Sequence, residues 1–315
     1  MLKLNQAAFE ICEKAIQQKD ELRIGHLKVG QTSVLDFGIE YPGSIAAGLK
    51  LAQICTSGLA SVGFLPQDNR SRFSMVTIET DQPLLACMAS QYAGWPVQNG
   101  KFFAMGSGPI RALRGKEPLL EKLSISEQAS KAVAVLETAK LPTEHVCELM
   151  AEESGIPPEN LVLACAPTAS ICGTIQIVAR SLETAMHKMF EIGFDLRKVV
   201  GGQGSAPLPP VGKNDLEAIG LTNDAILYGG EITLSVDCED DEELATFGRQ
   251  IPSSASKDFG RPFSEIFRSY DFDFYKIDPL LFSPAYVTLV NVRTGTCLSF
   301  GHKNVQLLRE TFVTT

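Results

Sequence analysis

The 315-residue sequence lacks the patterns of the most easily recognised classes of protein. It contains 8 cysteines and 4 histidines, but no Cys-x-x-Cys and no His-x-x-x-His, so the spacing predicts no metal site. Its apolar runs, such as residues 161–166, are far shorter than the ~20 residues that span a membrane. Charged residues also appear too early for a secretory signal peptide. We therefore expect a cytoplasmic protein whose cysteines are reduced and mostly buried.

Positive charge is scarce as well. The chain has 28 Lys and Arg against 37 Asp and Glu, a net charge of −9. Without a basic field it would attract neither phosphate backbones nor anionic lipid, so we expect neither nucleic acid nor a membrane as partner. With 44% hydrophobic and 21% charged residues the composition is that of ordinary globular domains, which excludes disorder of the whole chain.

The hydrophobic pattern mixes helices and strands. Helices are expected at 5–19, with Asn5 as N-cap, and at 45–55, because apolar residues recur there every three or four positions. Helices are also expected at 83–92 and, from its alanine and leucine content, at 127–140. A further helix is expected over 143–155 from its caps, and another is expected to start in the acidic segment 238–243. Alternating or short apolar runs mark the expected strands, which are 33–38, 61–65, 76–80, 161–166, 225–227, 232–236 and 285–292. Because no strict strand–helix rhythm emerges, we predict a mixed α/β (α+β) fold that is neither a Rossmann nor a P-loop fold.

The length indicates two domains in each subunit. We expect an N-terminal α/β domain over residues 1–110 and a second α/β domain over 111–315. Two alternatives stay open: the seam could fall in the Gly/Pro-rich segment 201–212, and a strand near 285–300 could return to the first domain.

One glycine-rich segment could hold an anion. Gly106, Ser107 and Gly108 permit a tight turn, and Arg111 and Arg114 follow where Pro109 can start a helix. The alternative is a plain turn with solvated arginines.

A second glycine-rich segment begins at Gly201 and Gly202. It superficially resembles a phosphate loop, but prolines follow it and no Gly-Lys-Ser/Thr occurs, which excludes that class. A backbone-lined wall of a cleft and an inert connector both remain possible.

A third segment carries an acid–base pair. If residues 176–191 form one helix, Gln176, Arg180, Glu183 and His187 share a polar stripe and Arg180 and Glu183 are neighbours. The simpler interpretation is an exposed ion pair worth a few tenths of a kcal/mol. The stripe follows an apolar strand and a Pro-Thr-Ala-Ser turn, where clefts commonly form, and this keeps a catalytic role open.

Several strings spread along the chain share a likeness to one family, the methenyltetrahydromethanopterin cyclohydrolases. They are Ser90-Gln-Tyr-Ala-Gly-Trp95, Phe103-Ala-Met-Gly-Ser-Gly-Pro109, Ala166-Pro-Thr-Ala-Ser170, Ala179-Arg-Ser-Leu-Glu-Thr-Ala-Met-His-Lys188, Gly204-Ser-Ala-Pro-Leu-Pro-Pro-Val211 and Thr222-Asn-Asp-Ala-Ile-Leu-Tyr-Gly-Gly230. In order and in spread these strings resemble that family over most of the sequence.

The resemblance implies a cytosolic homo-oligomer, commonly a trimer, whose two-domain subunits hold the pterin in a cleft between the domains and use no metal and no cofactor. Its substrate would be a tetrahydromethanopterin derivative, whose N5,N10-methenyl form plus water is interconverted with the N5-formyl form in one-carbon metabolism. The arginine and glutamate that the family links with catalysis fall on Arg180 and Glu183. Glu183 would act as general acid and base, and Arg180 would orient it. For His187, one turn further along, a contact with this pair and an ordinary solvated or core histidine both stay open.

The matching strings also suggest residues that contact the substrate. These are Gly106, Ser107, Gly108, Arg111, Thr168, Ser170, Gly201, Gly202, Asn223 and Asp224. One position departs from the family, because Leu221 stands where an arginine commonly precedes the Thr-Asn-Asp string. Two other functions stay open: a pterin-binding relative without activity, and a phosphate-handling transferase that uses the glycine loops.

Overall fold

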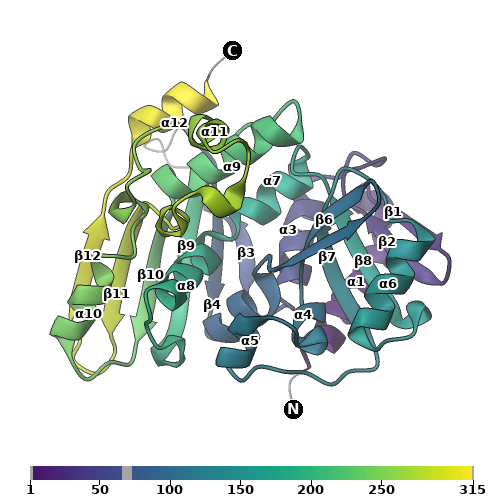
Figure 1. Ribbon diagram of the computed structural model, residues 1–315, viewed down its shortest axis with the longest axis horizontal. Coiled ribbons are helices and arrows are strands. Elements are labelled where there is room, and N and C mark those ends of the chain that lie inside the picture. The colour runs from purple at the N-terminus through teal and green to yellow at the C-terminus, as the bar shows by residue number, and fades with distance from the viewer. Residues whose placement is uncertain (1–2, 66–72, 314–315) are drawn as a thin grey trace. The chain divides into compact units, whose positions relative to one another are not determined.

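A computed structural model describes residues 3–65 and 73–313 of the chain (Figure 1). It divides into two compact units. Unit 1 comprises residues 1–60 and 85–176, and unit 2 comprises residues 61–84 and 177–315. The boundary predicted at residue 110 is therefore wrong, because the chain leaves unit 1 for a hairpin of unit 2 and then returns.

Unit 1 is built on a six-stranded mixed sheet in the order β1-β2-β8-β7-β6-β5. The strands are β1 (Gly25–Val29), β2 (Thr32–Asp36), β5 (Trp95–Asn99), β6 (Phe102–Ser107), β7 (Ala132–Glu137) and β8 (Leu161–Ala166). β2, β8 and β7 run parallel to one another, and the outer pairs are antiparallel.

Helices cover both faces of this sheet. They are α1 (Leu4–Gln17), α2 (Lys19–Leu22), α3 (Ile45–Cys55), α4 (Ile110–Arg114), α5 (Pro118–Lys122), α6 (Glu144–Ser154) and α7 (Ile171–Val178), with the single turn η2 (Pro158–Asn160) and the π-helix η1 (Leu84–Gln91). Val133 and Val135 of β7 pack under α1 and α3, while Ala134 and Leu136 face α6. Both faces of the central strands are therefore buried, as is usual for parallel strands.

Two expectations in unit 1 are wrong. The helix predicted over 127–140 is wrong: residues 132–137 form the strand β7, whose two valines face one buried side of the sheet and whose alanines and leucine face the other. Asn5 is not an N-cap: Lys3 precedes α1, and the buried Asn5 side chain donates to Pro109 O at 2.9 Å and to Glu127 Oε2 at 2.8 Å. The Asn5 side chain thus connects α1 to the buried segments around Pro109 and Glu127.

Unit 2 is built on a second six-stranded sheet in the order β12-β11-β10-β9-β4-β3. The strands are β3 (Ser61–Phe64), β4 (Met75–Thr80), β9 (Val199–Pro207), β10 (Glu231–Val236), β11 (Tyr286–Asn291) and β12 (Cys297–Gly301). Only β10 and β11 are parallel. The strands near 285–300 belong to this sheet and do not return to the first unit.

The helices of unit 2 pack on one face of its sheet. They are α8 (Ser181–Glu191), α9 (Asp215–Gly229), α10 (Asp241–Gly248), α11 (Phe263–Ser269) and α12 (Val305–Phe312), with the short turns η3 (Leu196–Lys198), η4 (Ser253–Ala255), η5 (Phe274–Lys276) and η6 (Pro279–Leu281). α8 contacts β9 and β10, α9 contacts β9, and α10 contacts β11 and β12. The strand expected at 225–227 is wrong, since these residues lie inside α9, which begins at the N-cap Asn214.

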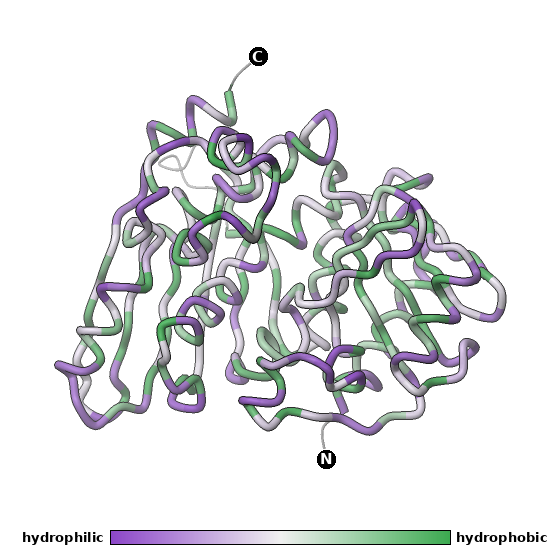
Figure 2. Tube along the Cα trace, in the orientation of Figure 1, coloured by the Kyte–Doolittle hydropathy of each residue, from purple (hydrophilic) through white to green (hydrophobic). Residues whose placement is uncertain are grey.

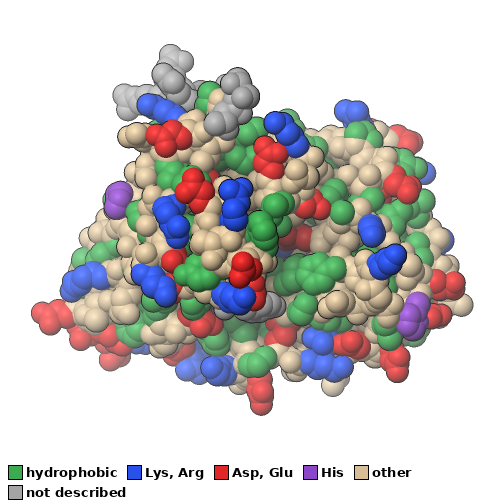
Figure 3. Space-filling view, turned by 45° about the horizontal axis from the view of Figure 1, so that its top comes forward, with side chains coloured by type: hydrophobic (Ala, Val, Ile, Leu, Met, Phe, Trp, Pro, Cys, Tyr) green, Lys and Arg blue, Asp and Glu red, His purple; other side chains and the backbone are tan. Residues whose placement is uncertain are grey.

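The acidic segment 238–243 contributes to the surface charge of unit 2. α10 begins in the acidic segment, as predicted, and Asp240 caps it by accepting from Glu242 N at 2.8 Å. Figure 2 shows this end of the unit as hydrophilic, and on the face in Figure 3 carboxylates gather there. Lysines and arginines are scattered over that face without forming a continuous patch (Figure 3).

The predicted mixed α/β fold is confirmed, because each unit has an open sheet with parallel and antiparallel pairs. Seven of the eight cysteines are buried, Cys297 is exposed, and all are free thiols. Within residues 3–65 and 73–313, no helix combines the length and apolar character needed to cross a membrane.

Candidate functional site

The acid–base pair lies at a break between two helices. The single helix predicted over 176–191 is wrong: α7 ends at Val178 and α8 begins at Ser181. Arg180 lies between them with φ −85° and ψ 6°. Its N donates to Ile177 O at 2.9 Å, and its carbonyl accepts from Thr184 N at 2.9 Å. Arg180 is therefore the N-cap residue of α8, and Glu183 is the third residue of that helix.

Arg180 and Glu183 are both ionisable and both buried, each with about 5% of its surface exposed. Burying ionisable side chains is costly, and sites that retain them are often catalytic or binding sites. The N-terminal turn of a helix also favours negative charge, so the position of Glu183 supports its ionised form. The first turn of α8 thus carries a carboxylate and a guanidinium that are both buried.

His187 is one turn further along α8. Its Nε2 lies 3.6 Å from Glu191 Oε1, a partly exposed pair within the same helix. The predicted stripe is interrupted, because Gln176 belongs to α7 and its Nε2 donates to Glu137 Oε1 of unit 1 at 3.1 Å.

Glu137 is a functional candidate that the sequence analysis does not identify, whereas its partner Gln176 belongs to the predicted polar stripe. Glu137 is the last residue of β7, at the carboxyl edge of the parallel strands β2, β8 and β7. Ligands of α/β sheets commonly bind at this edge. The signal in the sequence is the apolar run of β7 that ends in a carboxylate, but the alanine and leucine content of this segment predicts a helix.

Thr168 and Ser170 follow β8 at the same edge. The Ser170 hydroxyl accepts from Gly173 N at 3.0 Å and donates to Pro167 O at 2.7 Å, so it caps α7. Thr168 O accepts from Thr174 Oγ1 at 3.3 Å, and the Thr168 side chain is nearly buried. Both residues shape the turn that connects strand and helix.

The segment at Gly106–Gly108 is a strand end followed by a turn. Gly106 and Ser107 close β6, and Gly108 adopts φ +88° before α4. A Cβ at Gly106 would lie 2.9 Å from Trp95 O, and one at Gly108 would lie 3.1 Å from Val135 N. The buried Ser107 Oγ donates to Val135 O at 3.2 Å. These contacts serve close packing within unit 1.

Arg111 does not present its charge to a ligand. It is fully buried, with Nε donating to Glu117 Oε1 at 2.8 Å, Nη2 bonded to Glu117 Oε2, and Nη1 donating to Met88 O at 3.1 Å. Arg114 pairs with Glu153 at 2.8 Å and stacks over Trp95 at 4.3 Å. The interpretation of Arg111 as an anion contact is therefore wrong, because all three nitrogens have partners inside the unit.

Gly201 and Gly202 do not form a turn. Both lie in β9, which is bordered by β4 and β10. Their backbone groups face neighbouring strands, which removes the reason for expecting amides that reach a substrate. Gly202 instead lies beneath Leu182 of α8, where its Cβ would come within 2.8 Å of Leu182 Cδ1.

Asn223 and Asp224 lie in α9. Asn223 Nδ2 donates to Ile219 O at 2.9 Å, and the buried Asp224 Oδ1 accepts from Phe263 N at 2.7 Å. Burial raises the pKa of Asp224 to about 7, and the bond from Phe263 opposes this rise. Asp224 thus fixes the start of α11. Leu221, the departure from the family pattern, is also buried in α9.

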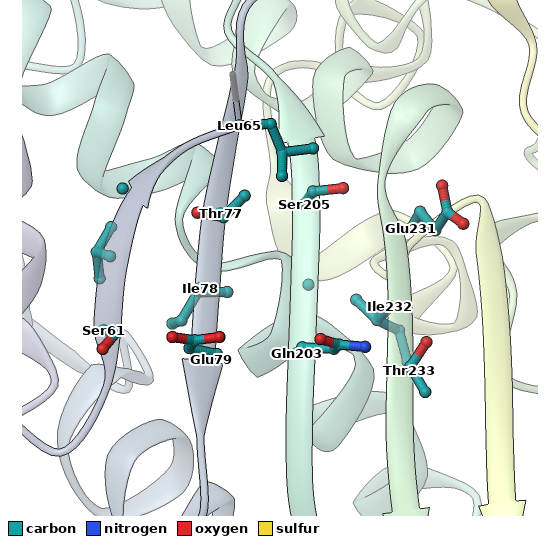
Figure 4. A pocket seen from close by; sticks show the side chains of 13 residues that line it. Ser61, Leu65, Thr77, Ile78, Glu79, Gln203, Ser205, Glu231, Ile232 and Thr233 are labelled. Atoms are coloured by element: carbon teal, nitrogen blue, oxygen red, sulfur yellow. The ribbon is translucent and has the colours of Figure 1, made fainter. Parts of the chain in front are cut away.

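A pocket of about 460 Å³ lies on the sheet of unit 2 (Figure 4). Its polar walls include Glu79, Gln203 and Thr233, which lie opposite one another in register on β4, β9 and β10. Because neighbouring residues of a strand point to opposite faces, this pocket faces away from α8 and the Arg180–Glu183 turn. In the described part of the chain, no three His, Cys, Asp or Glu side chains converge as a metal site would require.

Comparison with known proteins places these residues in a family. Residues 3–312 match the family described as cyclohydrolase (MCH). The methenyltetrahydromethanopterin cyclohydrolase of Rhodopirellula baltica is 45% identical over 98% of this chain and 94% of its own. Proteins of that name are 42% identical in Methylobacillus flagellatus, over 98% and 95%, and 40% identical in Methanocaldococcus jannaschii, over 98% of both chains. The chain therefore belongs to the methenyltetrahydromethanopterin cyclohydrolase family.

Proposed function

We propose that this chain is an enzyme that hydrolyses N5,N10-methenyltetrahydromethanopterin to the N5-formyl form, the reaction named for its relatives. The observation that carries the proposal is the buried Arg180–Glu183 turn of α8, in a chain that matches the family over residues 3–312. A buried carboxylate and guanidinium on one helical turn supply what this hydrolysis needs, namely a proton carrier and a group that holds it ionised.

The substrate carries an amidinium carbon between N5 and N10, which is electrophilic without further activation. Glu183 takes a proton from a water molecule as the water oxygen bonds to this carbon. The C–N10 bond then breaks, Glu183 returns its proton to N10, and the remaining hydroxyl proton leaves to solvent as the C=O of the N5-formyl group forms. General acid–base catalysis of this kind typically contributes about 10²–10⁴ in rate.

Arg180 favours the ionised form of Glu183 and orients it. Its planar guanidinium presents donors in a fixed fork, whereas a lysine would supply charge without that geometry. We expect Arg180→Lys to keep part of the affinity for substrate and to lower kcat.

The proposal includes no metal and no redox cofactor, because the electrophile is already cationic and no electrons are transferred. Activity should survive exhaustive treatment with a chelator. A loss of activity that zinc or another divalent ion restores would contradict this part of the proposal.

We also propose a cytoplasmic homo-oligomer, a trimer as the family resemblance implies. The free, mostly buried cysteines fit a reducing compartment. Light scattering coupled to size-exclusion chromatography tests the assembly, and about three times the 34.1 kDa of one chain is the expected mass.

The central experiment follows the methenyl chromophore. Purified, chelator-treated protein is mixed with methenyltetrahydromethanopterin, and the rate of chromophore loss is compared for wild type, Glu183→Gln and Glu191→Gln. Glu191→Gln is the matched control, because it makes the same change at the partly exposed far end of α8. We expect Glu183→Gln to lower kcat at least about tenfold and Glu191→Gln to leave it unchanged.

Two results would contradict the proposal. Near-normal turnover by folded Glu183→Gln would remove Glu183 from proton transfer. Binding of the pterin without any acceleration by wild type would indicate a binding protein or another pterin substrate, and the environment of Leu221 would then be the first to examine.

A further inference from the structure

The first turn of α8 lies directly on glycines of β9. A Cβ added at Gly204 would lie 2.9 Å from Ser181 Oγ and 3.0 Å from Ile232 Cγ2. A Cβ at Gly202 would lie 2.8 Å from Leu182 Cδ1 and 3.0 Å from Leu234 Cδ2. The helix therefore approaches the strand more closely than a side chain at either of these two positions would permit.

This contact is closed to solvent. Ser181 and Leu182 are fully buried, and Ile232 is 1% exposed. The Ser181 hydroxyl has no hydrogen-bond partner within the described part of the chain, so it is held against Gly204 by packing alone. A close-packed interior transmits a small change in volume as a displacement of its neighbours.

The two residues that touch the glycines are the first two of α8. Arg180 precedes them and Glu183 follows them, so the height of this turn above β9 sets the position of both ionisable side chains. We propose that Gly204 and Gly202 are positioning residues for catalysis, which hold the Arg180–Glu183 turn at its working distance from the sheet. This inference rests on the proposed function of Arg180 and Glu183.

The surrounding contacts determine which element would move. β9 is held by β4 on one side and β10 on the other. The second half of α8 is held by Lys188, which is buried and donates from Nζ to Leu280 O. A methyl group on Gly204 would therefore push the N-terminal turn of α8 outward and tilt the helix about its anchored end.

The test compares larger side chains at Gly204, beneath α8, with the same substitutions at a glycine elsewhere in the sheet. Gly204→Ala and Gly204→Val place a small and a larger side chain beneath Ser181. Gly63→Ala and Gly63→Val are the matched controls, because Gly63 lies in β3 of the same sheet and its Cβ would have only Thr77 Oγ1 nearby, at 3.7 Å. Each variant is assayed for kcat, KM and melting temperature.

We expect Gly204→Ala to lower kcat about tenfold with KM changed less than about threefold, because a displacement of a few tenths of an ångström misplaces reacting groups. Gly204→Val should lower kcat further. The Gly63 variants should keep the wild-type kcat. A purely structural role would lower the melting temperature of the Gly204 variants while the folded enzyme kept its kcat.

A rescue experiment identifies the contact. Ser181→Ala removes the hydroxyl that meets the new methyl group, and on its own it should change kcat by less than about threefold because that hydroxyl makes no bond to lose. The double variant Gly204→Ala/Ser181→Ala should recover at least about threefold in kcat over Gly204→Ala alone.

A wild-type kcat in Gly204→Ala, or a loss that Ser181→Ala does not relieve, would overturn the inference. If Gly204→Ala does not fold, Gly202→Ala takes its place, because its Cβ would meet Leu182 of the same turn at 2.8 Å, and a wild-type kcat there would count equally against the inference. Failure of the proposed function is a separate outcome, since it would appear as normal turnover by Glu183→Gln whatever the Gly204 variants do.

Discussion

The two sheets bury their strands differently. In unit 1 the central strand β8 is apolar along its whole length, and β7 is apolar up to its last residue, Glu137, because helices cover both faces. In unit 2 the strands β10 and β11 alternate between buried and half-buried residues, because the helices lie on one face only. The difference sets both how each sheet tolerates substitution and how easily it is recognised from sequence.

The largest expected effect comes from placing a charge in each sheet. Val135→Asp puts a carboxylate on a face of β7 that is 1% exposed, and we expect a loss of more than about 4 kcal/mol in the free energy of unfolding. Thr233→Asp, on the half-buried face of β10, should cost less than about 1 kcal/mol. Thermal and urea unfolding of both variants test the contrast, and equal losses would show that the second face of unit 2 is also covered.

Breaking a buried ion pair of unit 1 should cost more stability than breaking an exposed ion pair of unit 2. Arg111→Met leaves the buried Glu117 without its partner in unit 1, which should cost about 3–5 kcal/mol. Adding Glu117→Gln should recover part of this loss, because the uncompensated charge is then gone. Arg293→Met breaks the exposed pairs with Asp237 and Glu239 in unit 2 and should leave the melting temperature unchanged. A small effect of Arg111→Met would mean that water reaches Glu117.

The same difference explains what the sequence could predict of the fold. The alternating segments at 76–80, 232–236 and 285–292 were correctly predicted as the strands β4, β10 and β11. The segment at 132–137 was assigned to a helix, because a strand buried on both faces carries no alternation and its alanines favour a helix. The hairpin that leaves unit 1 could not be predicted, since a crossing between units has no local signal.

For the candidate site, the sequence predicts which family the residues belong to better than it predicts how those residues are arranged. The family resemblance is confirmed, but the continuous helix around Arg180 and Glu183 is wrong, because the chain breaks at residues 179–180 without a proline or glycine to mark it. The arginine at 111 was assigned to a ligand, whereas its partner is a glutamate only six residues away. Pairings of this kind depend on where a loop turns, which residue type alone does not determine.

A smaller effect is expected in the pH dependence of stability, to which each unit contributes one buried carboxylate. Burial raises the pKa of Asp224 to about 7, against about 3.9 in an unfolded chain. Folded protein therefore binds the extra proton between these values, and this group makes stability fall as pH rises from about 4 to about 7. We expect Asp224→Asn to flatten that part of the stability profile, measured as melting temperature against pH.

Glu127 of unit 1 is the control for this effect. Burial also raises its pKa, but bonds from the Asn5 side chain and backbone favour its charged form. Glu127→Gln should therefore change the slope less than Asp224→Asn does. The reverse order would mean that the bonds from Phe263 and Thr311 stabilise the Asp224 carboxylate better than the bonds from Asn5 stabilise that of Glu127.

The smallest expected effect concerns helix caps, which should not follow the contrast between the sheets. Thr143 caps α6 of unit 1 by accepting from Val146 N at 3.4 Å, and Asn214 caps α9 of unit 2 by accepting from Glu217 N at 3.0 Å. Each alanine substitution should cost about 0.5–2 kcal/mol, with Thr143→Ala at the lower end because its bond is longer. Thr143→Ser and Asn214→Asp keep an acceptor and should restore most of the loss. If both caps behave alike while the buried and half-buried strands do not, the difference between the units resides in how their sheets are covered, because a helix end depends on its own first turn in either setting.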